Sequence, residues 1–180
     1  DLGRTRAAVT LPRTRFSASE LAALAQETGR ICRRSFETPQ VLSCKGMTIV
    51  PKMGNVPPRI AETPSGILNS VGLQNIGVHG FIEYYLPTLK EEGNVIIANV
   101  AGATIDDYIA AAEALDVTNV DMIELNLSCP NVKAGGATWG VTCEGAASVT
   151  KAVRAATSKP RIVKLTPNAT EPAAVARTAR

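Results

Sequence analysis

The stretch VIIANVAGATIDDYIAAAEALDVTNVDMIEL, residues 95–125, decides the fold of this chain. Residues 95–100 and 120–125 are short apolar runs, typical of strands that are buried on both faces. Between them, Thr104 and Asp107 have the spacing of a capping box at the start of a helix. The stretch therefore predicts a strand, a helix and a second strand of a parallel sheet. The expected apolar helix positions are Tyr108, Ile109, Ala112 and Leu115.

The same alternation continues on both sides of this unit. A strand is expected at residues 41–44, and a helix at residues 78–91, where Gly93 follows its end. After residue 125, the pattern predicts a Gly-containing loop at 129–142, a helix at 146–156 and a strand at 161–165. Thr170 opens a last helix, and residues 51–76, rich in Pro, Gly and Asn, are expected to form a long loop.

Polar residues near the strand ends favour one of two α/β architectures. A doubly wound sheet usually binds its ligand at one switch point, whereas a (β/α) barrel gathers polar residues from the ends of several strands. Lys45, Asn99, Asn126 and Lys164 lie at or near the ends of four successive predicted strands. This pattern favours a TIM (β/α)8 barrel with a shared site at the carboxyl ends of the strands.

The chain is short for a complete barrel, because about 250 residues are usual for that fold. Its 180 residues stop in a predicted helix, and residues 1–39, rich in Arg and Thr, contain no clear first strand. We therefore expect the N-terminal half of a barrel, truncated after about the fourth to fifth strand. The expected domains are an atypical segment at 1–39 and a partial flavin-binding barrel domain at 40–180.

Composition argues against several classes of protein. The net charge of +3 and the 4% of aromatic residues do not suggest a partner that is a nucleic acid or a membrane surface. Four cysteines without a Cys-x-x-Cys motif and a single histidine, His79, make a zinc site improbable. No apolar stretch reaches the roughly 20 residues of a membrane span, and no secretory signal is visible, so the cytoplasm is expected.

The segment that follows residue 125 has the chemistry of a site. In NLSCPN, residues 126–131, the thiol of Cys129 lies between the carboxamides of Asn126 and Asn131. Carboxamides both donate and accept hydrogen bonds, and a thiol can remove a proton where its environment tunes it. A polar loop with an incidental thiol would explain the hexapeptide equally well.

Several stretches together resemble one enzyme family in order and spacing over roughly residues 40–172. They resemble the catalytic subunit of class 1 dihydroorotate dehydrogenases, flavin-dependent TIM barrels of pyrimidine biosynthesis. The continuation NVKAGG, residues 131–136, resembles the NAD-linked 1B branch more than the fumarate-linked 1A branch. The matching stretches are CKGMT (44–48), GNVPPR (54–59), ETPSGILNSVGLQN (62–75), NVAG (99–102), ELNLSCPNVKAGG (124–136) and VKLTPN (163–168).

The resemblance implies a role for individual residues. Cys129 would take the C5 proton of dihydroorotate while a hydride leaves C6 for FMN, the cofactor that performs the redox step. A positive charge at Lys164 would suit the reduced flavin. The FMN-binding residues would be Lys45, Gly46, Asn99, Asn126 and Lys164. The residues that bind the substrate would be Lys45, Asn69, Ser70, Val71, Gly72, Leu73, Asn126 and Asn131.

The resemblance also implies partners. The 1B branch implies a homodimer associated with an electron-transfer subunit, which would carry FAD and an iron–sulfur cluster and pass electrons to NAD. No metal site is implied on this chain. The alternatives are a dihydropyrimidine dehydrogenase-like flavoenzyme, whose flavin domain has a similar Asn-x-Ser-Cys-Pro segment, and an inactive fragment. Because residues 1–39 and the later barrel strands do not match, we expect the 180-residue chain alone to bind FMN weakly or not at all.

Overall fold

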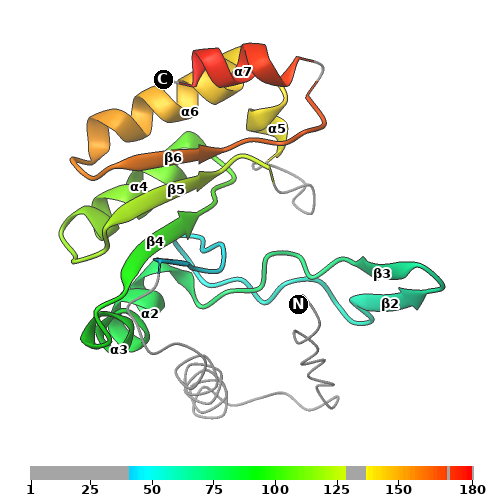
Figure 1. Ribbon diagram of the computed structural model, residues 1–180, viewed down its shortest axis with the longest axis horizontal. Coiled ribbons are helices and arrows are strands. Elements are labelled where there is room, and N and C mark those ends of the chain that lie inside the picture. The colour runs from blue at the N-terminus through cyan, green and yellow to red at the C-terminus, as the bar shows by residue number, and fades with distance from the viewer. Residues whose placement is uncertain (1–40, 129–136, 170, 180) are drawn as a thin grey trace. The chain divides into compact units, whose positions relative to one another are not determined.

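A four-stranded parallel sheet forms the centre of the compact unit that spans residues 39–180 (Figure 1). The structure is a computed structural model that describes residues 41–128, 137–169 and 171–179. The strands lie in the order β1-β4-β5-β6, and every neighbouring pair is parallel. Their bounds are β1 Val41–Ser43, β4 Val95–Val100, β5 Met122–Asn126 and β6 Arg161–Lys164.

The strand order agrees with the predicted architecture. Each strand of the sheet lies beside the strand that precedes it in the chain, so the order never reverses. A doubly wound sheet reverses its order at the switch point, whereas a barrel adds each new strand at the same edge. The sheet has the order of successive barrel strands, in agreement with the predicted partial (β/α) barrel.

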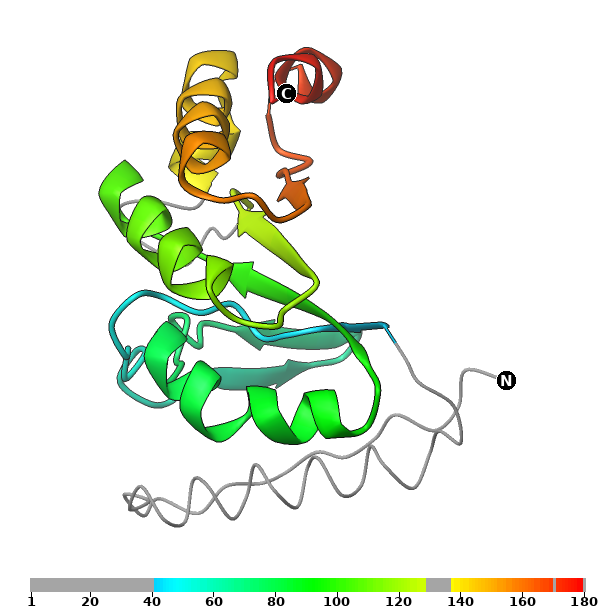
Figure 2. The same cartoon turned by 90° about the vertical axis from the view of Figure 1, so that its left-hand side faces the viewer.

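The helices follow the same order along one face of the sheet. Helix α2 contacts α4, α4 contacts α6, and α6 contacts α7. Figure 2 shows α4 and α6 side by side along the sheet. Because each connecting helix packs on the next, one layer of helices covers one face. The bounds are α2 Gly77–Tyr84, α3 Leu86–Glu91, α4 Ile105–Asp116, α5 Ala137–Gly140, α6 Cys143–Ala156 and α7 Pro172–Thr178.

The strand register separates two different faces of the sheet. On the helix-covered face, Ile96, Ala98 and Leu125 are fully buried in the hydrophobic core with Tyr108 and Leu115 of α4. Residues of the opposite face, here called the inner face, alternate with them along each strand. Register pairs on the inner face are Ile97 with Met122, Asn99 with Glu124, Glu124 with Ile162 and Asn126 with Lys164.

The predicted capping box of α4 is present. The Thr104 hydroxyl accepts a hydrogen bond from the Asp107 N–H at 3.2 Å, and Asp107 Oδ2 accepts from the Thr104 N–H at 2.9 Å. Two of the N–H groups left without helical partners at the start of α4 are thus satisfied. The start of α4 at Ile105 was predicted correctly for this reason.

The single helix expected at residues 78–91 was wrong, because the helix is interrupted at Tyr85 and continues as α3. Pro87 lies in the first turn of α3. Proline has no N–H to donate to the preceding turn and its ring crowds that turn, so a continuous helix ends before it. Both helices still pack on the core, because Phe81 of α2 and Leu86 of α3 are buried in it.

The long loop expected at residues 51–76 contains a β-hairpin, formed by β2 (Ile60–Thr63) and β3 (Gly66–Asn69). Its apolar residues are exposed, Ile67 and Leu68 by 65% and 66%, so no buried face produced a recognisable pattern. The loop expected at 129–142 likewise includes the short helix α5, and α6 begins at Cys143, where Thr142 caps it. In the described part of the chain, no helix has the length and apolar character needed to cross a bilayer.

We predict that the Asp107 cap makes stability depend on pH. Burial acts to raise the pKa of Asp107, but N–H donors from Thr104 and Ala103 outweigh it, and the pKa lies below the ordinary 3.8. A lowered folded-state pKa means that the stabilisation is present above pH 3.8 and is lost as the pH falls through the folded-state pKa. Asp107→Ala removes the carboxylate that accepts from the Ala103 and Thr104 N–H groups, and it should lower the free energy of unfolding at pH 7 by about 1 kcal/mol, a value kept small because solvent screens this part-exposed carboxylate.

Urea unfolding of the full-length protein at pH 7 and pH 3 measures this difference. The destabilisation by Asp107→Ala should shrink at the lower pH. Asp106→Ala is the matched control, because it removes a carboxylate from the same first turn without removing the capping hydrogen bonds. Equal losses for both variants at pH 7 would contradict the prediction.

Candidate functional site

The chain bulges where β1 passes the carboxyl end of β4. The Cys44 N–H donates to the Ile97 carbonyl, and the Met47 N–H donates to the Asn99 carbonyl, both at 2.9 Å. From Cys44 to Met47 the chain advances by three residues, whereas from Ile97 to Asn99 strand β4 advances by two. One extra residue is therefore inserted after β1, at Lys45 and Gly46. Such bulges bend a strand and redirect its backbone, often beside active sites.

Gly46 lies at the point where the predicted site residues converge. A Cβ atom placed on Gly46 would lie 2.9 Å from Asn99 Oδ1, 3.1 Å from Leu73 Cδ1 and 3.4 Å from Asn126 Nδ2. Only glycine leaves this space free, because the first two distances are too short for ordinary contacts with a Cβ. Four predicted residues from separate parts of the chain therefore meet here. We call Gly46, Leu73, Asn99 and Asn126 the Gly46 cluster.

The Asn99 side chain is buried, and only its amide nitrogen has a hydrogen-bond partner among the described residues. Its side chain is 4% exposed, and its Nδ2 donates a short hydrogen bond to Glu124 Oε1 on the neighbouring strand. Among the described residues, Asn99 Oδ1 is buried without a hydrogen-bond partner. A buried amide oxygen left unpaired costs roughly 1–3 kcal/mol, so this atom marks a position where a ligand donor would be favourable.

Asn126 is held in a definite orientation by the residues that follow it. Its Oδ1 accepts from the Ser128 N–H at 3.3 Å and from the Ser128 hydroxyl at 3.0 Å. The Tyr108 hydroxyl donates to the Asn126 backbone carbonyl at 3.0 Å, which ties the strand end to α4. Because Oδ1 is engaged by Ser128, the Nδ2 donor of Asn126 is the atom that faces Gly46.

Both predicted lysines are exposed, and each neighbours one member of this cluster, either along the chain or across the sheet. Lys45 precedes Gly46 in the bulge, and Lys164 is the register partner of Asn126 at the end of β6. An ammonium group attracts anionic or carbonyl oxygens. The carboxyl ends of β1, β4, β5 and β6 therefore bring amide and ammonium groups to one end of the sheet, as the sequence predicted.

Asn55 shapes the segment that was expected to bind the substrate. Its N–H donates to the Val71 carbonyl at 3.0 Å, and its side chain donates to the Ser70 carbonyl and hydroxyl at 3.0 and 2.8 Å. A Cβ on Gly72, whose φ is +74°, would lie 2.5 Å from Asn55 Oδ1. The segment therefore turns tightly around Asn55, a contact that sequence reasoning missed although Asn55 stands in a recognised motif.

The structure brings only part of the predicted substrate segment to the Gly46 cluster. Leu73, with a φ of +56°, reaches Gly46, whereas Asn69 and Ser70 are exposed on and after β3. Cys129 and Asn131 lie outside the described residues. Their predicted roles, and that of Asn69, remain predictions.

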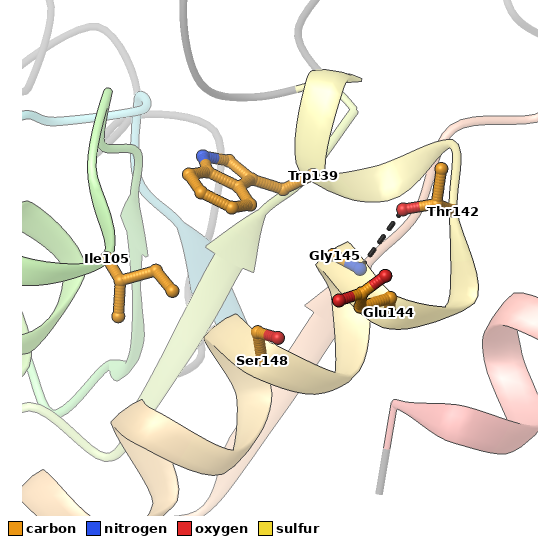
Figure 3. Close-up of a pocket in the computed structure, with 6 residues that line it drawn as sticks. All are labelled: Ile105, Trp139, Thr142, Glu144, Gly145 and Ser148. Atoms are coloured by element: carbon orange, nitrogen blue, oxygen red, sulfur yellow. Dashed lines mark hydrogen bonds between the residues drawn. The ribbon is translucent and has the colours of Figure 1, made fainter.

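A hollow lies between the start of α4 and the turn that leads into α6 (Figure 3). Its volume is about 260 Å³, and no predicted site residue lines it. Trp139 of α5 is half-buried and packs against the hydrophobic core, so its ring contributes to packing. The lining residues are Ile105, Trp139, Thr142, Glu144, Gly145 and Ser148.

The fold and the site agree with a family assignment. Residues 18–180 match the family model described as dihydroorotate dehydrogenase. The chain belongs to the dihydroorotate dehydrogenase family. This match begins before residue 40, where the sequence analysis had expected the recognisable part of the family to start.

Similar proteins are catalytic subunits of dihydroorotate dehydrogenase B (NAD(+)). The chain is 54% identical to the one from Porphyromonas gingivalis over 134 residues, 74% of this chain and 44% of that protein. It is 53% identical to the one from Thermoanaerobacter sp. (strain X514) over 124 residues, 69% of this chain and 41% of that protein. The chain thus spans less than half of the length of these dihydroorotate dehydrogenase relatives, and the resemblance to the 1B branch is confirmed.

We predict that Gly140 is required for α5 to pack against the strand end that carries the site. A Cβ on Gly140 would lie 2.0 Å from the Leu127 carbonyl oxygen, a backbone atom that cannot move aside easily. Gly140→Ala should lower the free energy of unfolding by about 1–3 kcal/mol, as overpacking does. Chemical denaturation of the full-length protein tests this expectation.

The matched control is Gly66→Ala in the β2–β3 hairpin, where a Cβ would meet no atom within 4 Å. It should change stability by less than about 1 kcal/mol. If Gly140→Ala is no more destabilising than Gly66→Ala, the close approach of α5 to Leu127 is not a constraint.

Proposed function

We propose that this protein carries out the FMN-dependent oxidation of (S)-dihydroorotate to orotate in de novo pyrimidine (UMP) biosynthesis. The observation that carries the proposal is the Gly46 cluster, in which two buried amides from neighbouring strands flank a bare glycine backbone. In a chain of this family, such a cluster at the carboxyl ends of barrel strands is where a planar, polar ligand would be held.

The residues of this end of the sheet fit the chemistry of FMN. Its ring system is flat, so it needs a surface without a side chain, and Gly46 provides one. Its polar edge needs donors and acceptors, which Asn99 and Asn126 offer from the inner face. When bound, the flavin supplies the acceptor for the hydride. The residues proposed to hold it are Lys45, Gly46, Asn99, Asn126 and Lys164.

The proposed proton acceptor is Cys129, which follows β5 by three residues. Dihydroorotate loses a proton from C5 to the thiolate and a hydride from C6, and a C5–C6 double bond forms. The proposed substrate contacts are Lys45, Asn126 and Asn131, with the segment 69–73. Lysine ammonium and carboxamide groups suit a ring with amide edges and a carboxylate.

Cys44 offers a useful contrast to Cys129. Burial raises the pKa of the Cys44 thiol to about 11, so this thiol stays protonated near neutral pH. It packs against the core and is no candidate for a base.

We propose that the protein works with an electron-transfer subunit. The relatives are named as catalytic subunits of an NAD(+)-linked enzyme, which implies a further subunit in those proteins. On this proposal, a homodimer of the full-length protein passes electrons through FAD and an iron–sulfur cluster of that partner to NAD in the cytoplasm.

An anaerobic visible spectrum of the full-length protein tests the reaction. Dihydroorotate should bleach the oxidised flavin band. Bleaching by dihydrouracil but not by dihydroorotate would move the assignment to a dihydropyrimidine dehydrogenase-like enzyme. Absence of flavin after reconstitution would overturn the proposal.

Cys129→Ala should lower the rate of flavin reduction by dihydroorotate about 10²–10⁴-fold, because general base catalysis contributes that much. FMN content should stay unchanged, since the thiol acts on the substrate. Stopped-flow absorbance measures the rate of flavin reduction across a pH series. The pH dependence of this rate reports the apparent pKa of the base. Cys143→Ser, at the start of α6, is the control and should leave the rate within twofold of the parent.

A further inference from the structure

We infer that Glu124 is a positioning residue that sets the orientation of the Asn99 amide, and that the Gly46 cluster thereby presents a paired acceptor and donor to the lactam edge of the flavin. A lactam edge is a ring N–H beside a ring C=O. This inference rests on the proposed function and deepens it, because it specifies how the ring is recognised.

The position of Glu124 follows from the sheet register. Glu124 is the direct register partner of Asn99, so both side chains leave the inner face side by side on neighbouring strands. Glu124 Oε1 accepts a short hydrogen bond from Asn99 Nδ2. An ionised carboxylate can only accept hydrogen bonds, so the NH₂ of Asn99 must face Glu124.

The consequence for Asn99 is a fixed acceptor. With Nδ2 held by Glu124, Oδ1 points to the opposite side, where it lies 2.9 Å from the Cβ position of Gly46. The Asn99 side chain is 4% exposed, and within the described ranges its Oδ1 has no partner. Without Glu124, the two ends of the amide would be nearly equivalent, and either could face Gly46.

The Asn126 amide is also held in one orientation, but its donor rather than its acceptor faces Gly46. The Ser128 backbone N–H can only donate, so the atom that faces it must be Asn126 Oδ1, at 3.3 Å. Asn126 Nδ2 then lies 3.4 Å from the same Cβ position of Gly46. One acceptor and one donor therefore face the same small volume, and each is held by a group that allows a single orientation.

A lactam edge is the complement of this pair. Its N–H donates to Asn99 Oδ1, and its C=O accepts from Asn126 Nδ2. The flavin ring and the dihydroorotate ring both contain such an edge. We assign the pair to the flavin, because both amides are at least 95% buried, as suits a resident cofactor, whereas Asn69 and Ser70 of the proposed substrate segment are exposed.

The test is a mutant cycle on the full-length dehydrogenase with four forms: parent, Glu124→Gln, Asn99→Asp and the double variant. Glu124→Gln lets either end of the Asn99 amide face Gly46, and FMN affinity should fall about fivefold to tenfold. Asn99→Asp places two carboxylates together and should lower FMN affinity more than tenfold. In the double variant, the glutamine NH₂ donates to the new aspartate, and the acceptor toward Gly46 returns.

FMN affinity is measured by equilibrium dialysis of the apoprotein, and orotate affinity by titration of the FMN-loaded forms. Rescue of FMN affinity in the double variant, to within about threefold of the parent, is the result expected when the residues act as one unit. Glu113→Gln on the exposed face of α4 is the matched control and should bind FMN like the parent. Circular dichroism of each apoprotein verifies that the variants are folded.

Three results would overturn the inference. Glu124→Gln could bind FMN as the parent does, or the double variant could be as weak as the two single losses combined. Orotate affinity could fall while FMN affinity stays unchanged, which would assign the lactam edge to the substrate. A parent protein that binds no FMN would overturn the proposed function itself, and this outcome is distinguishable because it appears before any variant is compared.

Discussion

The parallel register between β4 and β5 is the constraint on which the site depends. It places Asn99 beside Glu124, and the parallel register between β5 and β6 in turn places Asn126 beside Lys164. A shift of one residue would turn these side chains toward the helices, where the fully buried Ile96, Ala98 and Ile123 now pack. The hydrophobic core therefore holds the register, and the register holds the polar groups of the inner face.

The two ends of the sheet use polar groups differently. At the amino end, Asp121 binds the Lys90 ammonium at 2.7 Å and the Ile96 N–H at 2.6 Å. Burial acts to raise the pKa of Asp121, but Lys90 and the Ile96 N–H outweigh it and lower the pKa. Lys159 donates to the Thr118 and Val120 carbonyls at 2.8 and 3.0 Å. At the carboxyl end, by contrast, Asn99 Oδ1 is a buried acceptor that no described residue pairs. TIM barrels show the same division: residues at the amino ends of the strands stabilise the fold, and residues at the carboxyl ends bind the ligand.

Much of the fold could be predicted because its signals are local. The capping box of Thr104 and Asp107 marked the start of α4, and the apolar runs marked β4, β5 and β6. The β2–β3 hairpin was missed because its side chains are exposed and leave no buried pattern. Pro87 was the signal that could have divided the helix expected at 78–91, since proline rarely continues a helix.

For the site, the sequence by itself determined which residue types stand at the strand ends: Lys45, Asn99, Asn126 and Lys164. That information is local, because strand ends follow from runs of apolar residues. Only the tertiary structure decided how the amides are oriented, since that depends on Glu124 across the sheet and on Ser128 at the turn. Only the tertiary structure showed that Gly46 serves a close approach, because the atoms it meets belong to Leu73, Asn99 and Asn126, which are distant in the chain. Hydrogen-bond polarity and steric space are properties of neighbours in space, and the order of residues along the chain does not contain them.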